Sequence, residues 1–207
     1  MADTLHPKVA RADHDILDVI RDRWSPRAFD ATREVSAADL YRLFEAARWA
    51  PSSRNEQPWR FVVTNRRHSP EAFVALHDSL TPKNQVWAAA APVLILVAVR
   101  TTHEVDDLLN SHAWYDSGQA VGFLSLQATA MGLSTRQMQG FDLGRARSAC
   151  QIPEAFEPAV VMAVGHAGDP ETLSVLAHRE AELRPRARRS IAEFVYDATW
   201  GRELMLA

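Results

Sequence analysis

Hydrophobic and polar positions are arranged along this chain so that both helices and strands are predicted. Apolar side chains recur at helical spacing in four segments, residues 13–22, 36–50, 69–80 and 112–131. The second segment begins with Ser36, a good N-cap residue followed three positions later by an acid, and the third has Pro70 at its first helical position. A further short helix is expected from Asp142.

Three apolar runs predict strands, at residues 61–64, 92–99 and 159–165. The second run, PVLILVAV, is apolar throughout rather than alternating, which is typical of a strand covered on both faces. We interpret LSTRQMQGFD, residues 133–142, as a turn. Because helices and strands are mixed without a regular βαβ rhythm, the pattern favours an α+β domain with three layers over a doubly wound sheet.

The segment at 112–131 is apolar almost all round, so we expect a helix that is covered on most sides and ends at Gly132. Gly118, Gly122 and Ser125 recur along it at spacings of four and three residues. Small residues at this spacing let another backbone approach closely. Two interpretations stay open, which are packing under the sheet and a place in a subunit interface.

Composition narrows the class of protein. The chain has 207 residues, a net charge of −3 and 47% hydrophobic residues, which suits a single domain spanning residues 1–207. Near-neutral charge gives no reason to expect nucleic acid, and the longest apolar run is too short to span a membrane. The one cysteine, Cys150, excludes an internal disulfide, so we expect a cytoplasmic protein.

The common motifs for nucleotides, metals and serine catalysis are missing from the sequence. There is no glycine-rich phosphate loop, no zinc-binding histidine or cysteine pattern and no nucleophile elbow. Arginine is instead concentrated in two distant segments, RDRWSPRAFD near the start and HREAELRPRARRS near the end. Guanidinium groups match phosphate oxygens, so these segments either converge on one phosphate or form two solvated faces.

The stretch APSSRNEQPWRF, residues 50–61, holds many hydrogen-bonding side chains and no glycine, which is unusual for a plain turn. Together with RWSPRAF, WYDSGQAVGFLSLQATAMGL, QMQGFD, VMAVGHAGDP and RPRARRSIAEFVYDATWG, it resembles the FMN-dependent nitroreductase family. The resemblance runs from about residue 13 to the C-terminus, with the motifs in the family's order.

This resemblance implies a three-layer α-β-α fold with a mostly antiparallel sheet, in an intertwined homodimer. Each of two interface sites would bind FMN, take hydride from NADH or NADPH at flavin N5, and pass it to a nitroaromatic, quinone or similar acceptor. The alternative is an FMN-binding carrier or sensor without turnover. The resemblance also implies that residues 190–207 cross to the partner subunit, and residues 1–12 are expected to be flexible.

The resemblance also implies roles for single residues. Arg23 and Ser25 would bind the FMN phosphate or ribityl chain, Arg27 the pyrimidine edge, and Trp24 would contribute mainly its backbone. Two arginines near the C-terminus would close on the phosphate, Arg186 and Arg188.

Further cofactor contacts are implied elsewhere in the chain. The partner subunit would lay Pro51, Ser52, Ser53 and Asn55 against the flavin. A segment along the N5 side comprises Met138, Gln139 and Gly140, of which Gln139 or Gly140 would donate a backbone N–H to N5. Asn84 would contact the pyrimidine end. No side chain is expected to act as a catalytic acid or base, no metal is expected, and the short 101–116 segment favours an open site.

Overall fold

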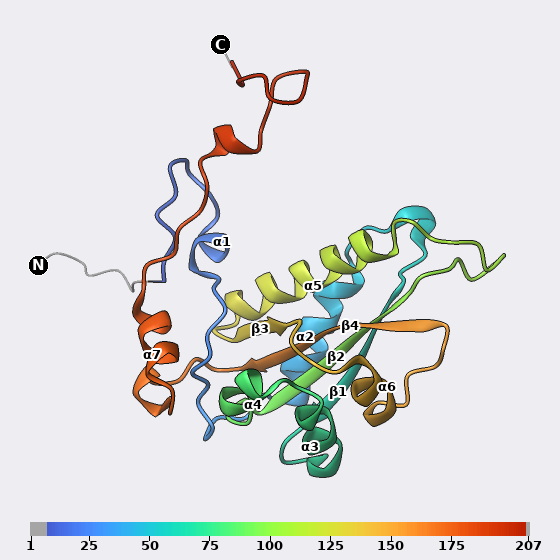
Figure 1. The fold of residues 1–207 in the computed structure, drawn as a ribbon, viewed down its shortest axis with the longest axis vertical. Coiled ribbons are helices and arrows are strands. Elements are labelled where there is room, and N and C mark those ends of the chain that lie inside the picture. The colour runs from blue at the N-terminus through green and yellow to red at the C-terminus, as the bar shows by residue number, and fades with distance from the viewer. Residues whose placement is uncertain (1–7, 206–207) are drawn as a thin grey trace, which may run out of the picture.

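The structure is a computed structural model that describes residues 8–205. Its centre is a four-stranded antiparallel sheet in the order β1-β2-β4-β3 (Figure 1). The strands are β1 (Trp59–Asn65), β2 (Val93–Arg100), β3 (Ser134–Met138) and β4 (Phe156–Gly165). From Val93 to Val99, β2 is buried throughout, as its continuous apolar run predicts. The predicted α+β class is confirmed.

Helices cover both faces of the sheet and make the predicted three layers. One layer holds α2 (Ala37–Arg48) and α5 (Ala113–Ala130), and the other holds α3 (Pro70–Asp78), α4 (Pro82–Ala88) and α6 (Leu143–Ala149). Because successive strand side chains point to opposite faces, β2 serves two cores. Its Val93, Ile95 and Val97 pack in the first core, while Leu94, Leu96 and Ala98 pack in the second.

Helix starts follow the sequence signals. The side chain of Ser36 accepts a hydrogen bond from the N–H of Asp39 at the start of α2, and Pro70 stands at the first turn of α3. Likewise, Asp142 caps α6 by accepting from the N–H of Arg145. The helix α4 has Pro82 in its first turn but was not predicted, because its seven residues are too few to show a periodic pattern.

Two sequence predictions are wrong. The helix predicted at 13–22 is only α1 (Asp18–Asp22), and the apolar Ile16, Leu17 and Ile20 are exposed in the single chain. A short helix without a packed face is marginal, which explains why it extends no further. The predicted turn at 133–142 contains the strand β3. Its polar sequence, STRQM, gives no apolar signal, and pairing with β4 makes it a strand.

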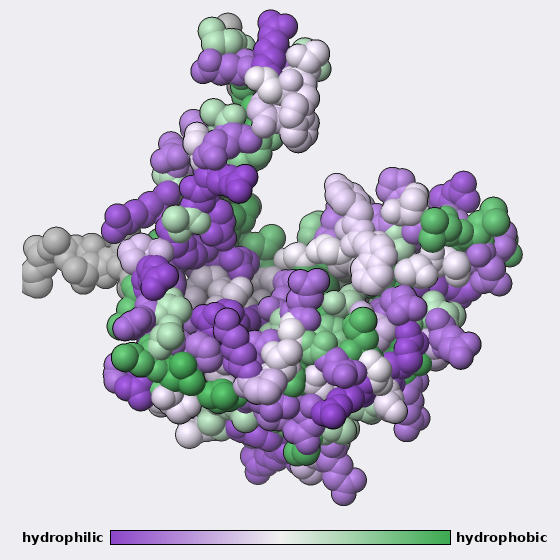
Figure 2. Space-filling view, in the orientation of Figure 1, coloured by the Kyte–Doolittle hydropathy of each residue, from purple (hydrophilic) through white to green (hydrophobic). Residues whose placement is uncertain are grey.

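The C-terminal part leaves the body of the molecule. After α7 (Leu176–Leu183), residues 184–205 run beside the N-terminal segment and then project outward (Figure 1). We call residues 190–205 the C-terminal arm. Figure 2 shows the arm as a separate projection with hydrophilic residues around its base. It carries exposed apolar side chains, among them Phe194 and Trp200, the latter 91% exposed.

No helix within residues 8–205 has the length and apolar character needed to cross a membrane. The expected flexibility of residues 1–12 falls largely on residues 1–7, which lie outside the described residues, as do residues 206 and 207 of the predicted extension. Within the described part, Lys8 is buried, and its ammonium group donates to the carbonyls of Ala181 and Arg184 at the end of α7.

Candidate functional site

The two arginine-rich segments meet in one pocket near the N-terminus of β3. Its lining includes six residues expected in the site, Arg23, Trp24, Ser25, Arg27, Arg186 and Arg188, together with Lys8, Arg136, Ala181 and Glu182. We call this the cation pocket. Segments near both ends of the chain, β3 and α7 contribute to it. Of the two readings left open by the sequence, the structure shows convergence rather than two separate solvated faces.

Charged side chains hold the chain from Arg21 to Ala28 in place. Arg186 donates to the carbonyls of Arg21 and Arg23, and Arg136 donates to the carbonyl of Ser25. Backbone polar groups need partners when they are withdrawn from water. Outside a sheet, the Arg23 and Ser25 carbonyls obtain partners from guanidinium groups, and the Arg21 carbonyl accepts from both Arg186 and the Ala10 N–H. Arg186 therefore links the last arginine segment to the first through direct hydrogen bonds.

The cations of the pocket are crowded and partly withdrawn from water. Burial, followed by repulsion from Arg27, lowers the pKa of Arg136 to about 10, and the charge of Glu182 opposes this shift. Burial, followed by repulsion from Arg23 and Arg188, lowers the pKa of Arg186. The Arg136 guanidinium also lies 5.2 Å from the centre of the Trp87 ring. Like charges in this arrangement favour binding of an anion.

Sequence reasoning missed Arg136. It stands alone in a polar segment interpreted as a turn, so only recognition of β3 would have placed it beside the first arginine motif. The Nε atoms of Arg136 and Arg186 are both buried, and neither has a hydrogen-bond partner among the described residues. Buried N–H donors without partners are uncommon and suggest that a further acceptor completes the pocket.

A second part of the site follows β3 along the chain. The Gly140 carbonyl accepts hydrogen bonds of 3.0 Å from the N–H of Thr81 and from the Asn84 amide. At ~3.3 Å per residue, Gly140 lies about 13 Å along the chain from Arg136. A Cβ atom at Gly140 would lie 2.8 Å from Asn84 Nδ2, so a larger residue would displace the Asn84 amide from the Gly140 carbonyl. Asn84 thus supports this loop, and α4 carries both Asn84 and Trp87.

The three residues of the expected N5 segment differ in their surroundings. Met138 is buried in the hydrophobic core, so only its backbone can face a ligand, while Gln139 is exposed. Within residues 8–205, the N–H groups of Gln139 and Gly140 take no part in the hydrogen bonds found outside helices and strands. Both N–H groups therefore fit the predicted role of a donor to a cofactor atom.

The loop at residues 50–57 is held by hydrogen bonds in an uncommon conformation. The Ser53 N–H donates to the buried Asp116 carboxylate over 2.9 Å, and the Gln57 N–H donates to Ser52 Oγ over 3.0 Å. Arg54, Asn55 and Gln57 have φ values of 52°, 59° and 46°, in the left-handed region that favours glycine. The many polar side chains of this loop therefore fix its shape in place of glycine.

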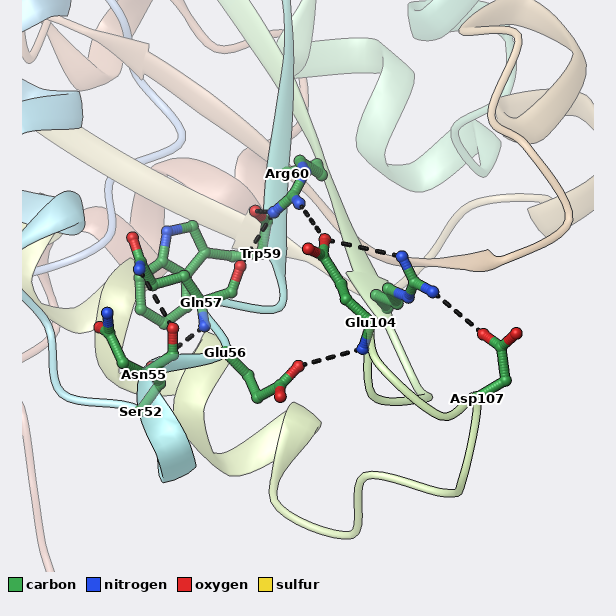
Figure 3. A network of polar contacts seen from close by, with 9 residues as sticks. Ser52, Asn55, Glu56, Gln57, Trp59, Arg60, Glu104 and Asp107 are labelled. Carbon is green, nitrogen blue, oxygen red and sulfur yellow. Dashed lines mark hydrogen bonds and ion pairs between the residues drawn. The ribbon is translucent and has the colours of Figure 1, made fainter.

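A hydrogen bond to Glu56 and an ion pair of the adjoining Arg60 connect this part of the chain to residues 101–110 (Figure 3). Glu56 points inward, where it accepts from the Glu104 N–H over 3.3 Å and lies 3.3 Å from Nδ1 of His103. The Glu104 carboxylate pairs in turn with Arg60 at 3.2 Å and Arg100 at 3.6 Å. Glu56 therefore joins two loops and does not face open solvent, whereas Arg54 is exposed.

A model of the nitroreductase family matches residues 20–166. The chain belongs to the nitroreductase family. An uncharacterised 15.4 kDa protein of Mycolicibacterium smegmatis is 32% identical over 151 residues, which cover 70% of this chain and 99% of that protein. The major NAD(P)H-flavin oxidoreductase of Aliivibrio fischeri is 34% identical over 97 residues, covering 45% of this chain and 43% of that protein. A crystal structure described as an oxidoreductase containing FMN superimposes with a TM-score of 0.86 at 28% identity, covering 93% of this chain and 96% of that one.

One chain of this nitroreductase-family protein does not bring all the predicted site residues together. The loop containing Pro51, Ser52, Ser53 and Asn55 lies at the N-terminal end of α5, whereas the cation pocket lies beyond its other end (Figure 1). A helix of 18 residues is about 27 Å long. The loop of the same chain therefore does not reach the pocket.

The surface of α5 helps to decide between the two interpretations of its small residues. No atom of residues 8–205 lies within 4 Å of a Cβ atom built on Gly118 or Gly122, so neither glycine is packed tightly against the described part of the chain. Trp114, Tyr115 and Phe123 on the same helix are exposed. These glycines do not serve packing under the sheet, and the interface interpretation is favoured.

Proposed function

We propose that this nitroreductase-family protein is an FMN-dependent oxidoreductase that uses NADH or NADPH as reductant. The observation that carries the proposal is the meeting of Arg23, Ser25 and Arg27 with Arg186 and Arg188 in one pocket. These residues match the family positions for the cofactor. The solved relative is described as containing FMN, and the A. fischeri relative is named an NAD(P)H-flavin oxidoreductase.

The residues present fit FMN chemically. Forked guanidinium donors and a serine hydroxyl suit a phosphate group, and phosphate oxygens would provide the acceptor missing from the buried Nε atoms of Arg136 and Arg186. The flavin ring would extend along β3 toward Gly140. There the backbone approaches closely because glycine has no Cβ atom, and the N–H groups of Gln139 and Gly140 are available to a ring acceptor.

Bound FMN would supply the redox chemistry, by taking hydride from the nicotinamide and delivering it to an oxidised acceptor. The chain's own residues bind and orient the cofactor. Arg27, beside the pyrimidine edge, would favour negative charge at that edge, as a fixed donor does for developing charge. We assign no acid or base, because solvent can protonate the product.

The site is completed by a second copy of the chain in this proposal. If two α5 helices pack antiparallel through Gly118 and Gly122, each 50–57 loop moves to the partner's cation pocket. Two observations support this arrangement: the open space over both glycines, and the exposed aromatic residues on the same helix. The C-terminal arm, with exposed Phe194 and Trp200, would cross to the partner as well.

The acceptor is proposed to be a small conjugated molecule such as a quinone or nitroaromatic, reached by exchange with the nicotinamide at one open face. The segment between β2 and α5 is short, and its Glu104 and Asp107 are engaged in ion pairs with Arg60 and Arg100. An open site of this kind suits broad acceptor specificity. A cytoplasmic location is part of the same proposal.

Anaerobic titration tests this function directly. Purified protein reconstituted with FMN should be yellow, and NADH or NADPH should bleach it without a third component. Subsequent addition of a quinone or nitroaromatic should restore the colour. Bound FMN that neither nicotinamide bleaches would support the carrier or sensor alternative, and a protein that takes up no FMN would refute both readings.

A further inference from the structure

Glu182 is a buried carboxylate in a group of cations. It lies on α7, is 2% exposed, and is the one acidic residue among the described residues that line the cation pocket. His178, four positions earlier on α7, is also buried. A buried carboxylate is costly unless partners compensate it, so its contacts should reveal its role.

The contacts of Glu182 are made with the residue expected beside the flavin ring. One carboxylate oxygen accepts from the Arg27 N–H over 3.0 Å, and the other accepts from the Ala28 N–H over 3.4 Å. The Arg27 guanidinium lies 3.8 Å from Glu182, within ion-pair range but too far for a hydrogen bond. Glu182 thus holds both the backbone and the charge of Arg27.

The influence of Glu182 extends to other cations of the pocket. Burial lowers the pKa of Lys8, the charge of Glu182 acts to raise it, and Arg27, Arg184 and Arg186 lower it further. Glu182 similarly opposes the loss of basicity of Arg136. The side chain therefore serves as an internal counter-charge to the cations around it.

We propose that Glu182 is a positioning residue that fixes Arg27 and restrains the positive potential of the cation pocket. Because it partly cancels that potential, it weakens the binding of anions. It also lowers the reduction potential of a flavin whose pyrimidine edge faces Arg27. The second consequence rests on the proposed function, whereas the first needs only the pocket.

The substitution Glu182→Gln removes the charge and keeps the side-chain shape. Its matched control is Glu180→Gln, the same change on the exposed side of the same helix. The affinity of the cofactor-free full-length protein for inorganic phosphate is measured by calorimetry. The potential of bound FMN is measured against a reference dye. Removing one buried charge near the pocket should tighten phosphate binding severalfold and shift the dye equilibrium on the order of tenfold toward reduced flavin.

The two measurements separate the proposals. If the protein binds no FMN, the proposed function fails, and the phosphate affinities alone decide the role of Glu182. If FMN binds but both Glu→Gln variants match wild type in potential and phosphate affinity, the role of Glu182 is overturned and the function stands. A shift of equal size in both variants also overturns it, since a distant surface charge would then suffice.

The charge removal could also prevent folding, so a second pair of variants is included. Replacing both members of a buried ion pair is tolerated better than removing one. The double variant R27Q/E182Q is therefore compared with R27Q alone. The double variant should bind phosphate more tightly than the single one, and equal affinity would contradict the proposed counter-charge.

Discussion

The exchange Arg188→Ala tests the phosphate assignment with little disturbance to the fold. Arg188 lines the cation pocket and is exposed, and among the described residues it donates a hydrogen bond only to the neighbouring Ala187 carbonyl. Arg186, in contrast, also holds the Arg21 and Arg23 carbonyls, so its removal would disturb the backbone as well. Arg188 is therefore the better residue to remove.

The expected loss follows from the contact that Arg188 would make. A hydrogen bond to a charged group contributes about 1.5–3 kcal/mol, and solvent exposure places Arg188 at the low end of that range. Its removal also relieves repulsion that lowers the pKa values of Arg23 and Arg186. A net loss of about 1–1.5 kcal/mol corresponds to FMN binding roughly 5–13-fold more weakly.

Riboflavin lacks the phosphate and provides the internal comparison. Calorimetric titration of cofactor-free protein should show weaker FMN binding in the Arg188→Ala variant, with riboflavin affinity unchanged within about twofold. The exposed neighbour Arg189→Ala, outside the cation pocket, serves as control. An equal loss for both ligands, or no loss for FMN, would show that Arg188 does not bind the phosphate.

Three other changes test separate parts of the structure. Gly140→Ala should destabilise the protein by about 1–3 kcal/mol in urea unfolding, since its Cβ atom would lie 2.8 Å from Asn84 Nδ2. A loss of stability no larger than that of the control Gly144→Ala would contradict this prediction. Burial and the nearby cations Arg27, Lys83 and Arg136 lower the pKa of His178 below 6.5. Just below pH 6.5 the unfolded chain therefore binds more protons than the folded chain, and the free energy of unfolding falls as the pH drops. His178→Gln should reduce the loss of unfolding free energy between pH 7.5 and 5.5. An unchanged loss would show that His178 does not cause this pH dependence. Truncation after Arg189 should weaken the proposed dimer in sedimentation experiments, and a variant that stays dimeric and retains FMN would argue against a role for the C-terminal arm.

The sequence predicted the helices and strands whose apolar side chains are buried within one chain, because burial produces a recognisable hydrophobic pattern. The strand β2 is covered on both faces, and its apolar run shows this directly. In contrast, β3 is an edge strand formed by pairing with β4, and its residues Ser134, Thr135 and Arg136 carry no hydrophobic signal. The predicted first helix failed for a related reason, because its apolar residues Ile16, Leu17 and Ile20 stay partly exposed in the described part of a single chain.

The candidate site was predictable where its residues match family motifs. Arg23 and Arg27 of the first segment and Arg186 and Arg188 of the second belong to such motifs, and the structure brings these four together. Glu182 and Arg136 belong to none of the quoted motifs that assign cofactor contacts. In sequence, Glu182 lies in the charged run HREAEL, which resembles a solvated helix face. Only the packing of α7 against Arg27 and Ala28 shows that this acid is buried.

The position of the two half-sites connects cofactor binding with assembly. Asp116 anchors the 50–57 loop at one end of α5, and the cation pocket lies beyond the other end. A ligand that contacts both parts must bridge two copies of the chain, so it binds the dimer more tightly than the monomer. By linkage, the cofactor then stabilises the dimer to the same extent that dimerisation improves its binding. In the proposed dimer, the exposed glycines and aromatic residues of α5 would therefore contribute to cofactor binding energetically, although no contact with the flavin is proposed for any of them.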